Sequence, residues 1–344
     1  WALAMGVFWT IVIEISLPPV VRWVSRQSWW PAAMPVQKKL VVNFGYPEDK
    51  SDLFPEGLTS AHLAELYGAV WIFVGMHAMC FTPMLPVLFL GWEESGIFWR
   101  TAFVIGALAD VGFDIYDWLK TTWKTWLPAH FARTTGQCPG PMPYWVIMCL
   151  LHHPLAMTLV IPMNAHYAWL PAYHKITVAL LGAASICFGL GQYKLTLDIS
   201  KKSGFIAFKS IVFAAFVVIF YTRAIVWAIE VRSALSTFDA LGDSTFYWAG
   251  IMCATLMSLF NVALINDATS ALIKYAFKSL PTSEKDTEEI AEELATSPAL
   301  GRRMSRRLST FSTFNRLSAS QKWKVSGTGV IAGQRMSTLA KKQS

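Results

Sequence analysis

Long runs of apolar residues, separated by short polar stretches, dominate the chain from its start to Leu280. A helix that crosses a bilayer needs about 20 mostly apolar residues, and seven windows meet that requirement. They are Leu3–Val21, Ala61–Leu90, Ile97–Leu119, Tyr144–Met163, Ile176–Tyr193, Gly204–Ala228 and Phe246–Leu264. We expect Pro18 and Pro19 to end the first helix, and Pro83 and Pro86 to break the second. The pattern predicts an all-α polytopic membrane protein.

The composition supports lipid, rather than water, as the solvent around most of the chain. Of the 344 residues, 54% are hydrophobic and only 15% are charged, whereas soluble domains carry roughly 25% charged residues. A water-soluble fold of this length cannot cover so much apolar surface, which excludes two soluble domains and a disordered chain. The five cysteines are odd in number and widely spaced, so they do not indicate a disulfide scaffold.

The net charge of +7 comes from the end of the chain. Residues 301–344 contain ten Lys and Arg and no acidic residue, whereas the rest of the chain has 19 basic and 22 acidic residues. Cytoplasmic loops of membrane proteins are enriched in Lys and Arg. The loops on one side of seven spans would carry eleven such residues, and those on the other side two. This bias predicts an N-terminus outside and a C-terminus in the cytoplasm.

After Leu280 the sequence becomes polar. An acidic stretch is followed by a segment rich in Ser, Thr and Arg, with too few large apolar residues to form a core. We therefore divide the chain into three parts: a first transmembrane helix with a cytoplasmic loop (1–57), a transmembrane domain (58–280) and a disordered, basic cytoplasmic tail (281–344).

Two kinds of short motif occur in the tail. Ser305, Ser309 and Ser318 each follow arginine at a spacing that resembles substrates of basophilic protein kinases. Each phosphate would add roughly −1.5 to −2 charges and would release a basic strip from anionic lipid. Lys341 and Lys342 match a di-lysine signal, which coat proteins read for return to the endoplasmic reticulum. A chance Lys-Lys pair in a basic tail is the alternative.

Three aspartates lie in the third predicted span, where ionisable side chains are costly. At 100° per residue, Asp110, Asp114 and Asp117 fall on one helical face, within about 60° of one another. Carboxylates so close together repel unless a proton, a metal or another cation lies between them. The alternative is that Asp117 lies at the wet end of the helix and Asp114 alone is buried.

His152 and His153 stand near the middle of the fourth predicted span. Adjacent helical residues point about 100° apart, so we expect one ring to meet a cavity and the other a neighbouring helix. Neutral imidazole acts as a base, a nucleophile or a metal ligand, which makes the pair a candidate catalytic site. The alternative is that both rings hydrogen-bond to backbone or Asp groups and hold helices together.

Other polar residues in the spans are candidates for substrate binding. Together with two of the aspartates, the candidates are Asp110, Asp117, Arg223, His77 and Asn261. Arg223 needs a counter-charge, for which the aspartate face supplies candidates; a position at the membrane interface is the alternative. We expect Asn266 and Asp267 to mark the cytoplasmic end of the last helix.

Several common motifs are absent. The sequence contains no Gly-rich phosphate loop, no Cys-x-x-Cys pair, no zinc-binding helix motif and no serine nucleophile elbow. We therefore expect no metal and no resident cofactor. Nucleic-acid binding is not expected, because no nucleic-acid-binding fold accompanies the basic tail.

The polar residues of the spans stand in motifs that resemble those of TLC-domain proteins, a membrane family that includes the ceramide synthases. The segment Gly112–Asp117 resembles the family's G-Y-F-x-Y-D helix, and Tyr144-Trp145 followed by Leu151-His152-His153 resembles its double-histidine helix. Phe216–Arg223 is similar to its F-F-x-x-R helix, and Asn261 falls in its last span. The resemblance covers about residues 60–275, with the motifs in the expected order.

This resemblance implies a bundle of helices around a central, lipid-sized cavity that contains the double histidine. On matching positions, His152 and His153 would carry acyl transfer from acyl-CoA to a lipid, with Asp114 as a polar partner and Arg223 as a wall residue. Acyl-CoA and a membrane lipid would be the substrates. The H-D-x-S-D element that follows the histidines in ceramide synthases is absent here, so the resemblance is to the broader TLC group, whose members sense, move or acylate lipids.

We therefore expect an endoplasmic-reticulum membrane protein that binds or modifies a lipid, with acyl transfer as the enzymatic hypothesis. Three alternatives remain: a non-enzymatic lipid sensor or transporter, a subunit of a membrane complex, and a seven-helix receptor or channel. The last fits seven spans with an outside N-terminus. However, the sequence lacks Asp-Arg-Tyr after the third span, Asn-Pro-x-x-Tyr in the seventh and a mid-span lysine for retinal.

Overall fold

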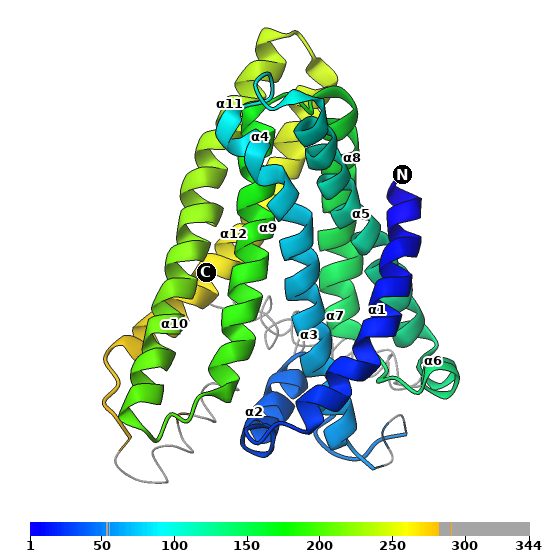
Figure 1. Cartoon of the computed structure of the whole chain (residues 1–344), viewed down its shortest axis with the longest axis vertical. Coiled ribbons are helices and arrows are strands. Elements are labelled where there is room, and N and C mark those ends of the chain that lie inside the picture. The colour runs from blue at the N-terminus through cyan, green and yellow to red at the C-terminus, as the bar shows by residue number, and fades with distance from the viewer. Residues whose placement is uncertain (53, 55, 282–289, 291–344) are drawn as a thin grey trace, which may run out of the picture.

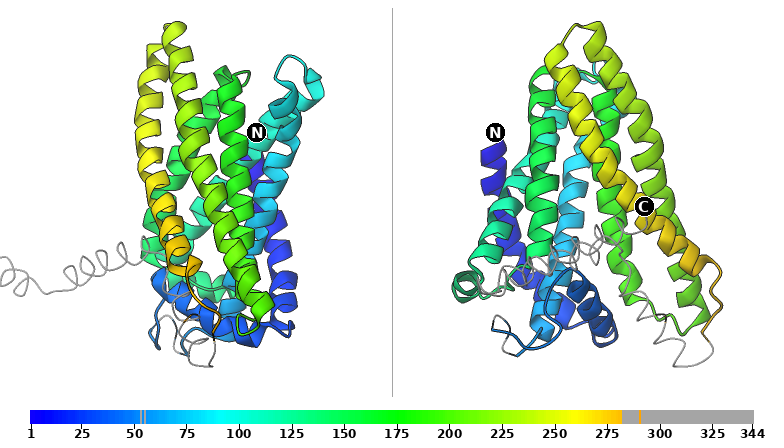
Figure 2. Two further views of the ribbon diagram at one scale, coloured as in Figure 1. Left: turned by 90° about the vertical axis from the view of Figure 1, so that its left-hand side faces the viewer. Right: turned by 180° about the vertical axis from the view of Figure 1, so that it is seen from behind.

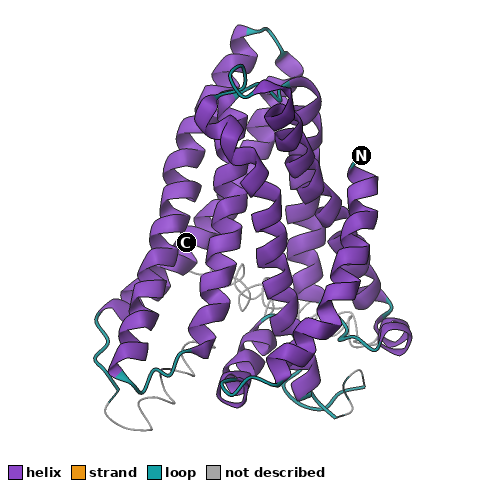
Figure 3. Cartoon of the chain, in the orientation of Figure 1, coloured by secondary structure: helices purple, strands orange, loops and turns teal. Residues whose placement is uncertain are grey.

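The computed structural model of the chain describes residues 1–52, 54, 56–281 and 290, and in this part it contains helices and loops but no strand (Figure 3). The tail residues singled out above, Ser305, Ser309, Ser318, Lys341 and Lys342, lie outside the described residues. In chain order the helices are α1 (Ala2–Ser25), α2 (Trp30–Asn43), α3 (Ser60–Phe81), η1 (Thr82–Met84), α4 (Leu85–Leu90), α5 (Gly96–Trp126), α6 (Pro128–Thr135), α7 (Met142–Trp145), η2 (Val146–His152), α8 (His153–His166), α9 (Pro171–Tyr193), η3 (Lys194–Thr196), α10 (Lys202–Phe220), η4 (Tyr221–Val226), α11 (Trp227–Ala240) and α12 (Ser244–Ala276).

Seven helical segments are long and apolar enough to cross a membrane, and each contains one of the seven expected windows. They are Ala2–Ser25, Ser60–Leu90, Gly96–Trp126, Met142–His166, Pro171–Thr196, Lys202–Ala240 and Ser244–Ala276. At most 33% of the residues in any of these apolar windows are buried inside the protein. Most residues of these windows are therefore at least partly exposed, as a surface in contact with lipid requires, and the prediction of an all-α polytopic membrane protein is confirmed.

The segments form an elongated bundle (Figures 1 and 2). Helix α3 packs against α1 and α9, α1 also packs against α5, and α5 packs against α8. On the other side of the bundle, α10 packs against α12, and α11 packs against α9 and α12. The short helices α2 and α6 lie at the same end (Figure 1). The long helices therefore form the middle of the bundle.

Two helix ends differ from the expectation. Helix α1 continues through Pro18 and Pro19 to Ser25, because transmembrane helices tolerate proline where neighbouring helices and local adjustments satisfy the freed backbone groups. Helix α12 continues past Asn266 and Asp267 to Ala276. Neither residue is a proline or a glycine, so nothing in the local sequence breaks the helix there.

Prolines do interrupt the second span as expected. The short turn η1 separates α3 from α4 and contains Pro83, and Pro86 follows in the first turn of α4. A proline inside a helix removes one hydrogen bond and clashes with the carbonyl four residues earlier, so the local tightening at η1 has a direct cause.

Two stretches of π-helix interrupt the regular helices. One is η2, which ends at His152, and the other is η4, which contains Arg223. Single π-helical turns inside α-helices are rare and occur frequently at functional sites. In the part of the chain that the structure describes, both stretches therefore coincide with residues that the sequence singled out.

The sequence after His153 explains the first π-helical stretch. The N–H of His153 bonds to the carbonyl of Met148, five residues back. Pro154 comes next and has no N–H to donate to the carbonyl of Leu150. The regular ladder of hydrogen bonds therefore cannot continue across this point, and the helix widens just before the two histidines.

The turn between α11 and α12 is held by Asp243. Its carboxylate accepts hydrogen bonds from the hydroxyl of Tyr167 (2.7 Å) and the backbone N–H of Phe246 (3.1 Å). These bonds favour the charged form and hold the pKa of Asp243 below its ordinary value. Because Tyr167 follows α8 directly, the contact ties the upper end of α8 to the start of α12.

Helices α1 and α5 cross at Gly6 and Gly112. A Cβ atom on Gly112 would lie 2.7 Å from the backbone carbonyl carbon of Met5 and 2.8 Å from the backbone nitrogen of Gly6. Both distances are shorter than van der Waals contact, so only glycine allows this backbone approach. The crossing sets the position of α5 and hence of the aspartates that follow Gly112.

Replacing Gly112 by alanine is expected to lower the melting temperature of the detergent-solubilised protein by roughly 3 °C or more, since overpacking costs about 1–3 kcal/mol. The matched control is Gly75→Ala in α3, where a Cβ would meet nothing within 4 Å. Alanine is the better helix former by about 1 kcal/mol, so Gly75→Ala should leave stability unchanged or raise it. Equal melting temperatures for the two variants would contradict the close crossing.

Candidate functional site

His153 lies between two aspartates of α5. Its Nδ1 is 2.7 Å from Oδ1 of Asp114, and its Nε2 is 2.9 Å from Oδ2 of Asp117. The side chains of His153, Asp114 and Asp117 are only 1%, 5% and 4% exposed. With both carboxyl groups ionised, each only accepts, so both ring nitrogens donate and the ring is an imidazolium. The buried trio then carries a net charge of −1.

The burial of Asp117 corrects one alternative drawn from the sequence. Asp117 does not lie at a wet helix end, because α5 continues to Trp126 and the Asp117 side chain is buried. Its Oδ1 also accepts a hydrogen bond from the hydroxyl of Thr121 (3.2 Å). Asp114 and Asp117 therefore share a helix face, as their spacing predicted, and the imidazole of His153 links them.

His152 differs from its neighbour in having no hydrogen bond within the described residues. Its Nδ1 is buried and unpartnered, and so is Oδ2 of Asp114. The His152 ring makes only ring contacts, with centroid distances of 5.4 Å to His153 and 5.6 Å to Phe260 of α12. The two histidines thus occupy different positions: His153 is fixed by α5, and His152 is turned toward α12 with an unused nitrogen.

Arg223 pairs with Asn261 instead of an aspartate. A guanidinium N–H of Arg223 donates to Oδ1 of Asn261 (3.1 Å), and Asn261 is buried. No carboxylate of the described residues forms an ion pair with Arg223. The prediction that the aspartate face supplies its counter-charge is therefore wrong. Asn261 follows Phe260 directly, and this places the Arg223–Asn261 pair beside the ring that contacts His152.

His77 and Asp110 lie at the edge of this centre. His77 Nδ1 is 2.7 Å from the carbonyl oxygen of Phe73, and its ring centroid is 6.1 Å from that of Phe113, the residue before Asp114. Asp110 is partly buried and makes no hydrogen bond within the described residues. The structure therefore joins Asp114, Asp117 and His153 by hydrogen bonds, whereas the described hydrogen bonds of the other candidates are with other residues.

A second polar network lies on α5 and was not expected from the sequence. Oε1 of Glu14 accepts hydrogen bonds from the Tyr116 hydroxyl (2.8 Å) and the Lys120 ammonium (2.5 Å). Its Oε2 accepts one from the Gln137 amide (2.8 Å). Lys120 comes directly after the predicted span Ile97–Leu119 and counts among the eleven basic loop residues expected from the sequence, whereas it lies in α5. The one-turn spacing of Tyr116 and Lys120 was the available signal, but nothing in the sequence paired them with Glu14.

We expect a double-mutant cycle on Glu14→Gln and Lys120→Met to give a coupling free energy of about 1–2 kcal/mol, the range for a charged hydrogen bond that is not fully buried. The two side chains are 37% and 16% exposed, which keeps the value below that of a fully buried pair. Thermal unfolding of the four proteins measures it. A cycle on the exposed Lys201–Asp198 pair, 75% and 51% exposed, is the matched control and should give less than 1 kcal/mol. Equal coupling in both cycles would contradict the role of burial.

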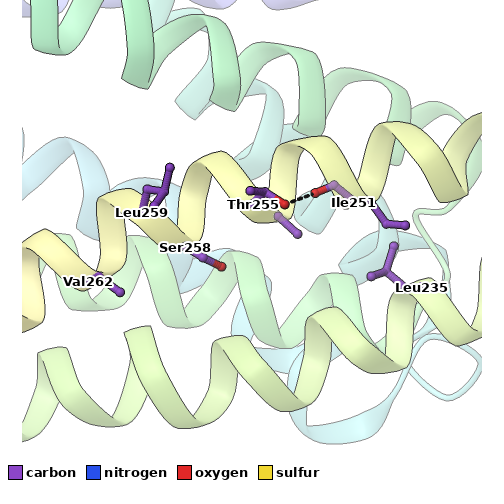
Figure 4. A pocket seen from close by; sticks show the side chains of 7 residues that line it. Leu235, Ile251, Thr255, Ser258, Leu259 and Val262 are labelled. Carbon is purple, nitrogen blue, oxygen red and sulfur yellow. Dashed lines mark hydrogen bonds between the residues drawn. The ribbon is translucent and has the colours of Figure 1, made fainter. Parts of the chain in front are cut away.

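The structure is hollowed between α11 and α12 (Figure 4). A groove of about 380 Å³ is lined by Leu235 of α11 and by one stripe of α12: Ile251, Ala254, Thr255, Ser258, Leu259 and Val262. None of the candidate site residues lines it. Its lining is mainly apolar, and Ser258 lies one helical turn from Asn261. This groove does not reach the histidines, so the central, lipid-sized cavity expected around them stays a prediction.

Three side chains of the centre are also placed to hold a metal ion. Asp114, His152 and His153 each offer one ligand atom, and these atoms lie within 4.8 Å of one another. The motif search of the sequence missed this group because Asp114 stands 38 positions before His152 and 39 before His153, in a different span. Their convergence is a property of the packing of α5 against α8.

No family model, curated protein or solved structure matches this chain. The function is therefore inferred from the geometry of the site and from the sequence motifs that it contains.

Proposed function

We propose that this chain is a TLC-like integral membrane protein that binds a lipid and transfers an acyl group to it from acyl-CoA at the His152–His153 centre. The observation that carries the proposal is the unequal state of the two histidines. His153 is bonded at both ring nitrogens, whereas Nδ1 of His152 is buried and unpartnered. A nitrogen with its lone pair unused, inside a membrane span, is suited to general-base catalysis.

In the proposed reaction, His152 takes the proton from the amine or hydroxyl of the lipid acceptor. The acceptor nitrogen or oxygen forms a bond to the thioester carbonyl carbon, and the carbon–sulfur bond breaks. The departing CoA thiolate takes the proton from His152, so that an amide or ester and a free thiol are formed and the histidine is regenerated. His153 acts as a positioning residue, because its two hydrogen bonds to α5 fix the backbone that carries His152.

The depth of the site suits a lipid acceptor. His153 is eleven residues from the start of its span at Met142, which corresponds to ~16 Å along a helix, about half of a hydrocarbon core of roughly 30 Å. The apolar groove beside Ser258 offers one place for an acyl chain, one turn from Asn261. Arg223 forms a polar pair with Asn261, which in the sequence follows Phe260, the ring that contacts His152, and precedes Val262, which lines the groove.

We also propose that the end of the bundle that contains α2 and α6 faces the cytoplasm. Arg22 and Lys124 lie in the last turns of α1 and α5 at this end, and Arg133 lies in the last turn of α6. Positive residues concentrate on the cytoplasmic side, where they would also attract the phosphates of acyl-CoA. Residence in the endoplasmic reticulum remains part of this proposal.

The test is turnover of acyl-CoA by the purified full chain with a panel of long-chain amine and alcohol acceptors. Release of free CoA thiol that depends on the acceptor, together with an acylated lipid detected by mass spectrometry, is the expected result. Absence of turnover with every acceptor, combined with a lipid that copurifies in fixed ratio to the protein, would overturn acyl transfer in favour of a lipid sensor or transporter.

A further inference from the structure

We infer that Asp114, His152 and His153 form a binding site for a divalent transition metal of the zinc type. One ligand atom from each residue lies within 4.8 Å of the others. Two nitrogens and one carboxylate oxygen form a common zinc donor set, and three protein ligands with a fourth open position are typical of zinc sites that act on a substrate. Magnesium and calcium are not expected, because they need six or more oxygen ligands.

Unpartnered atoms at the site point independently to a missing ligand. Oδ2 of Asp114 has no hydrogen-bond partner, although its side chain is only 5% exposed. Nδ1 of His152 is also buried without a partner. A buried polar atom that lacks a partner costs about 1–3 kcal/mol, and here two such atoms occur on neighbouring side chains. A metal ion bound between the two residues would satisfy both.

The position of Asp117 supports the same assignment. A histidine that binds a metal through one ring nitrogen almost always donates the other N–H to a carboxylate or carbonyl. Nε2 of His153 is already held by Asp117 at 2.9 Å, so Nδ1 of His153 is the nitrogen left for the metal. Asp117 would therefore supply the carboxylate of a carboxylate–histidine–metal arrangement once Nδ1 exchanges its contact with Asp114 for the ion.

Binding requires only a small rearrangement. Bonds of ~2.0–2.1 Å to a tetrahedral zinc ion place the ligand atoms roughly 3.3 Å apart. The His152 ring has no hydrogen bond to break as it closes in, whereas the contact between His153 Nδ1 and Asp114 Oδ1, now 2.7 Å, has to open slightly. The proton in that contact leaves to solvent as the ion enters, and the buried net charge of −1 becomes zero.

The ion would also regulate the proposed reaction. A metal bound to His152 occupies the lone pair that general-base catalysis needs, so zinc would inhibit acyl transfer reversibly. This second statement depends on the proposed function, but the metal site itself does not. Binding and turnover are measured separately, and failure of one leaves the other standing.

The test uses the full chain in detergent, stripped with EDTA and dialysed, and isothermal titration calorimetry with zinc chloride. We expect one zinc ion per chain in the wild type and at least tenfold weaker binding in His152→Phe. Asp117→Asn, which changes a partner of His153 and of Thr121 but no proposed metal ligand, should weaken binding by about tenfold. His166→Phe is the matched control, because His166 packs on Phe246 outside the site, and it should bind zinc as the wild type does.

His152→Phe removes a ligand without removing a hydrogen bond, so its folding is checked by an unchanged melting temperature. Absence of one-site zinc binding in the wild type would overturn the inference. Affinity that is equal in the wild type and in a folded His152→Phe variant would overturn it too, since the zinc would then occupy another site. Binding of magnesium as tight as that of zinc would overturn the assignment to a transition metal. Inhibition of turnover by zinc, reversed by EDTA, is the expected result for regulation.

Discussion

Replacing His152 by phenylalanine is expected to abolish acyl transfer while the melting temperature of the protein stays unchanged. A general base contributes about 10²–10⁴ to the rate, and phenylalanine cannot accept a proton. His152 makes no hydrogen bond within the described residues, and a phenyl ring preserves the contacts with His153 and Phe260. Turnover of acyl-CoA and thermal unfolding in the same detergent measure the two effects.

His166→Phe is the matched control for this experiment. His166 lies in the last turn of the same helix and contacts Phe246 through its ring, so its replacement should change neither activity nor stability. Full activity in His152→Phe would rule out His152 as the base. A large loss of stability in the same variant would show that its ring has a structural role instead.

Replacing His153 by phenylalanine is expected to destabilise the protein by about 3–5 kcal/mol, the cost of leaving a buried charge without its partner. This corresponds to a melting temperature lower by roughly 10 °C. The reason is that Asp114 and Asp117 would face an apolar ring and each other, while both side chains stay at least 95% buried. Thermal unfolding in detergent measures the loss, and turnover is expected to fall with it.

A rescue variant separates electrostatics from packing in this second prediction. Changing Asp114 and Asp117 to asparagine in the His153→Phe background removes both buried charges and keeps the shape of their side chains. The melting temperature should then recover by at least half of the loss, while turnover should stay absent. If the asparagines bring no recovery, the cost of His153→Phe comes from packing, and the charge-linking role of His153 is wrong.

The comparison of His152 with His153 shows what the sequence predicts and what it does not. Helical geometry alone predicted that the two rings point in different directions. It did not predict which ring faces the aspartates, because that depends on the rotation of α8 against α5. Pro154 and the π-helical stretch before it change that rotation, and their effect on the register is not visible as a hydrophobic pattern.

The membrane spans were the part of the fold most open to prediction. Their signal is a sum over about 20 residues, so one misplaced polar residue does not erase it. Helix ends depend on a few local residues, and there the predictions at Pro18 and at Asn266 failed. Lys120 illustrates the same effect: it lies where the apolar window stops, but the helix continues to Trp126.

Partners across helices were the least predictable part of the site. The spacing of Asp114 and Asp117 put both carboxylates on one face, and this much is confirmed by their shared contact with His153. Arg223, however, bonds to Asn261, and Glu14 joins Lys120, although neither pair is close in sequence. Pairing of this kind depends on which helices are neighbours, and one sequence carries no direct signal for that.

Several hydrogen bonds join α5 to the fourth span. Besides the links to His153, the Trp145 indole N–H donates to Thr122 (2.9 Å), and the Trp118 indole N–H donates to the carbonyl of Cys149 (3.1 Å).

These bonds fasten the fourth span to α5 at several heights. On its other side, the same span contacts α12 through the rings of His152 and Phe260 and the rings of His166 and Phe246, and Tyr167, just after α8, bonds to Asp243. None of these contacts with α12 involves α5, so we expect that a lipid reaching His152 sideways from the bilayer between α8 and α12 would break no hydrogen bond of α5.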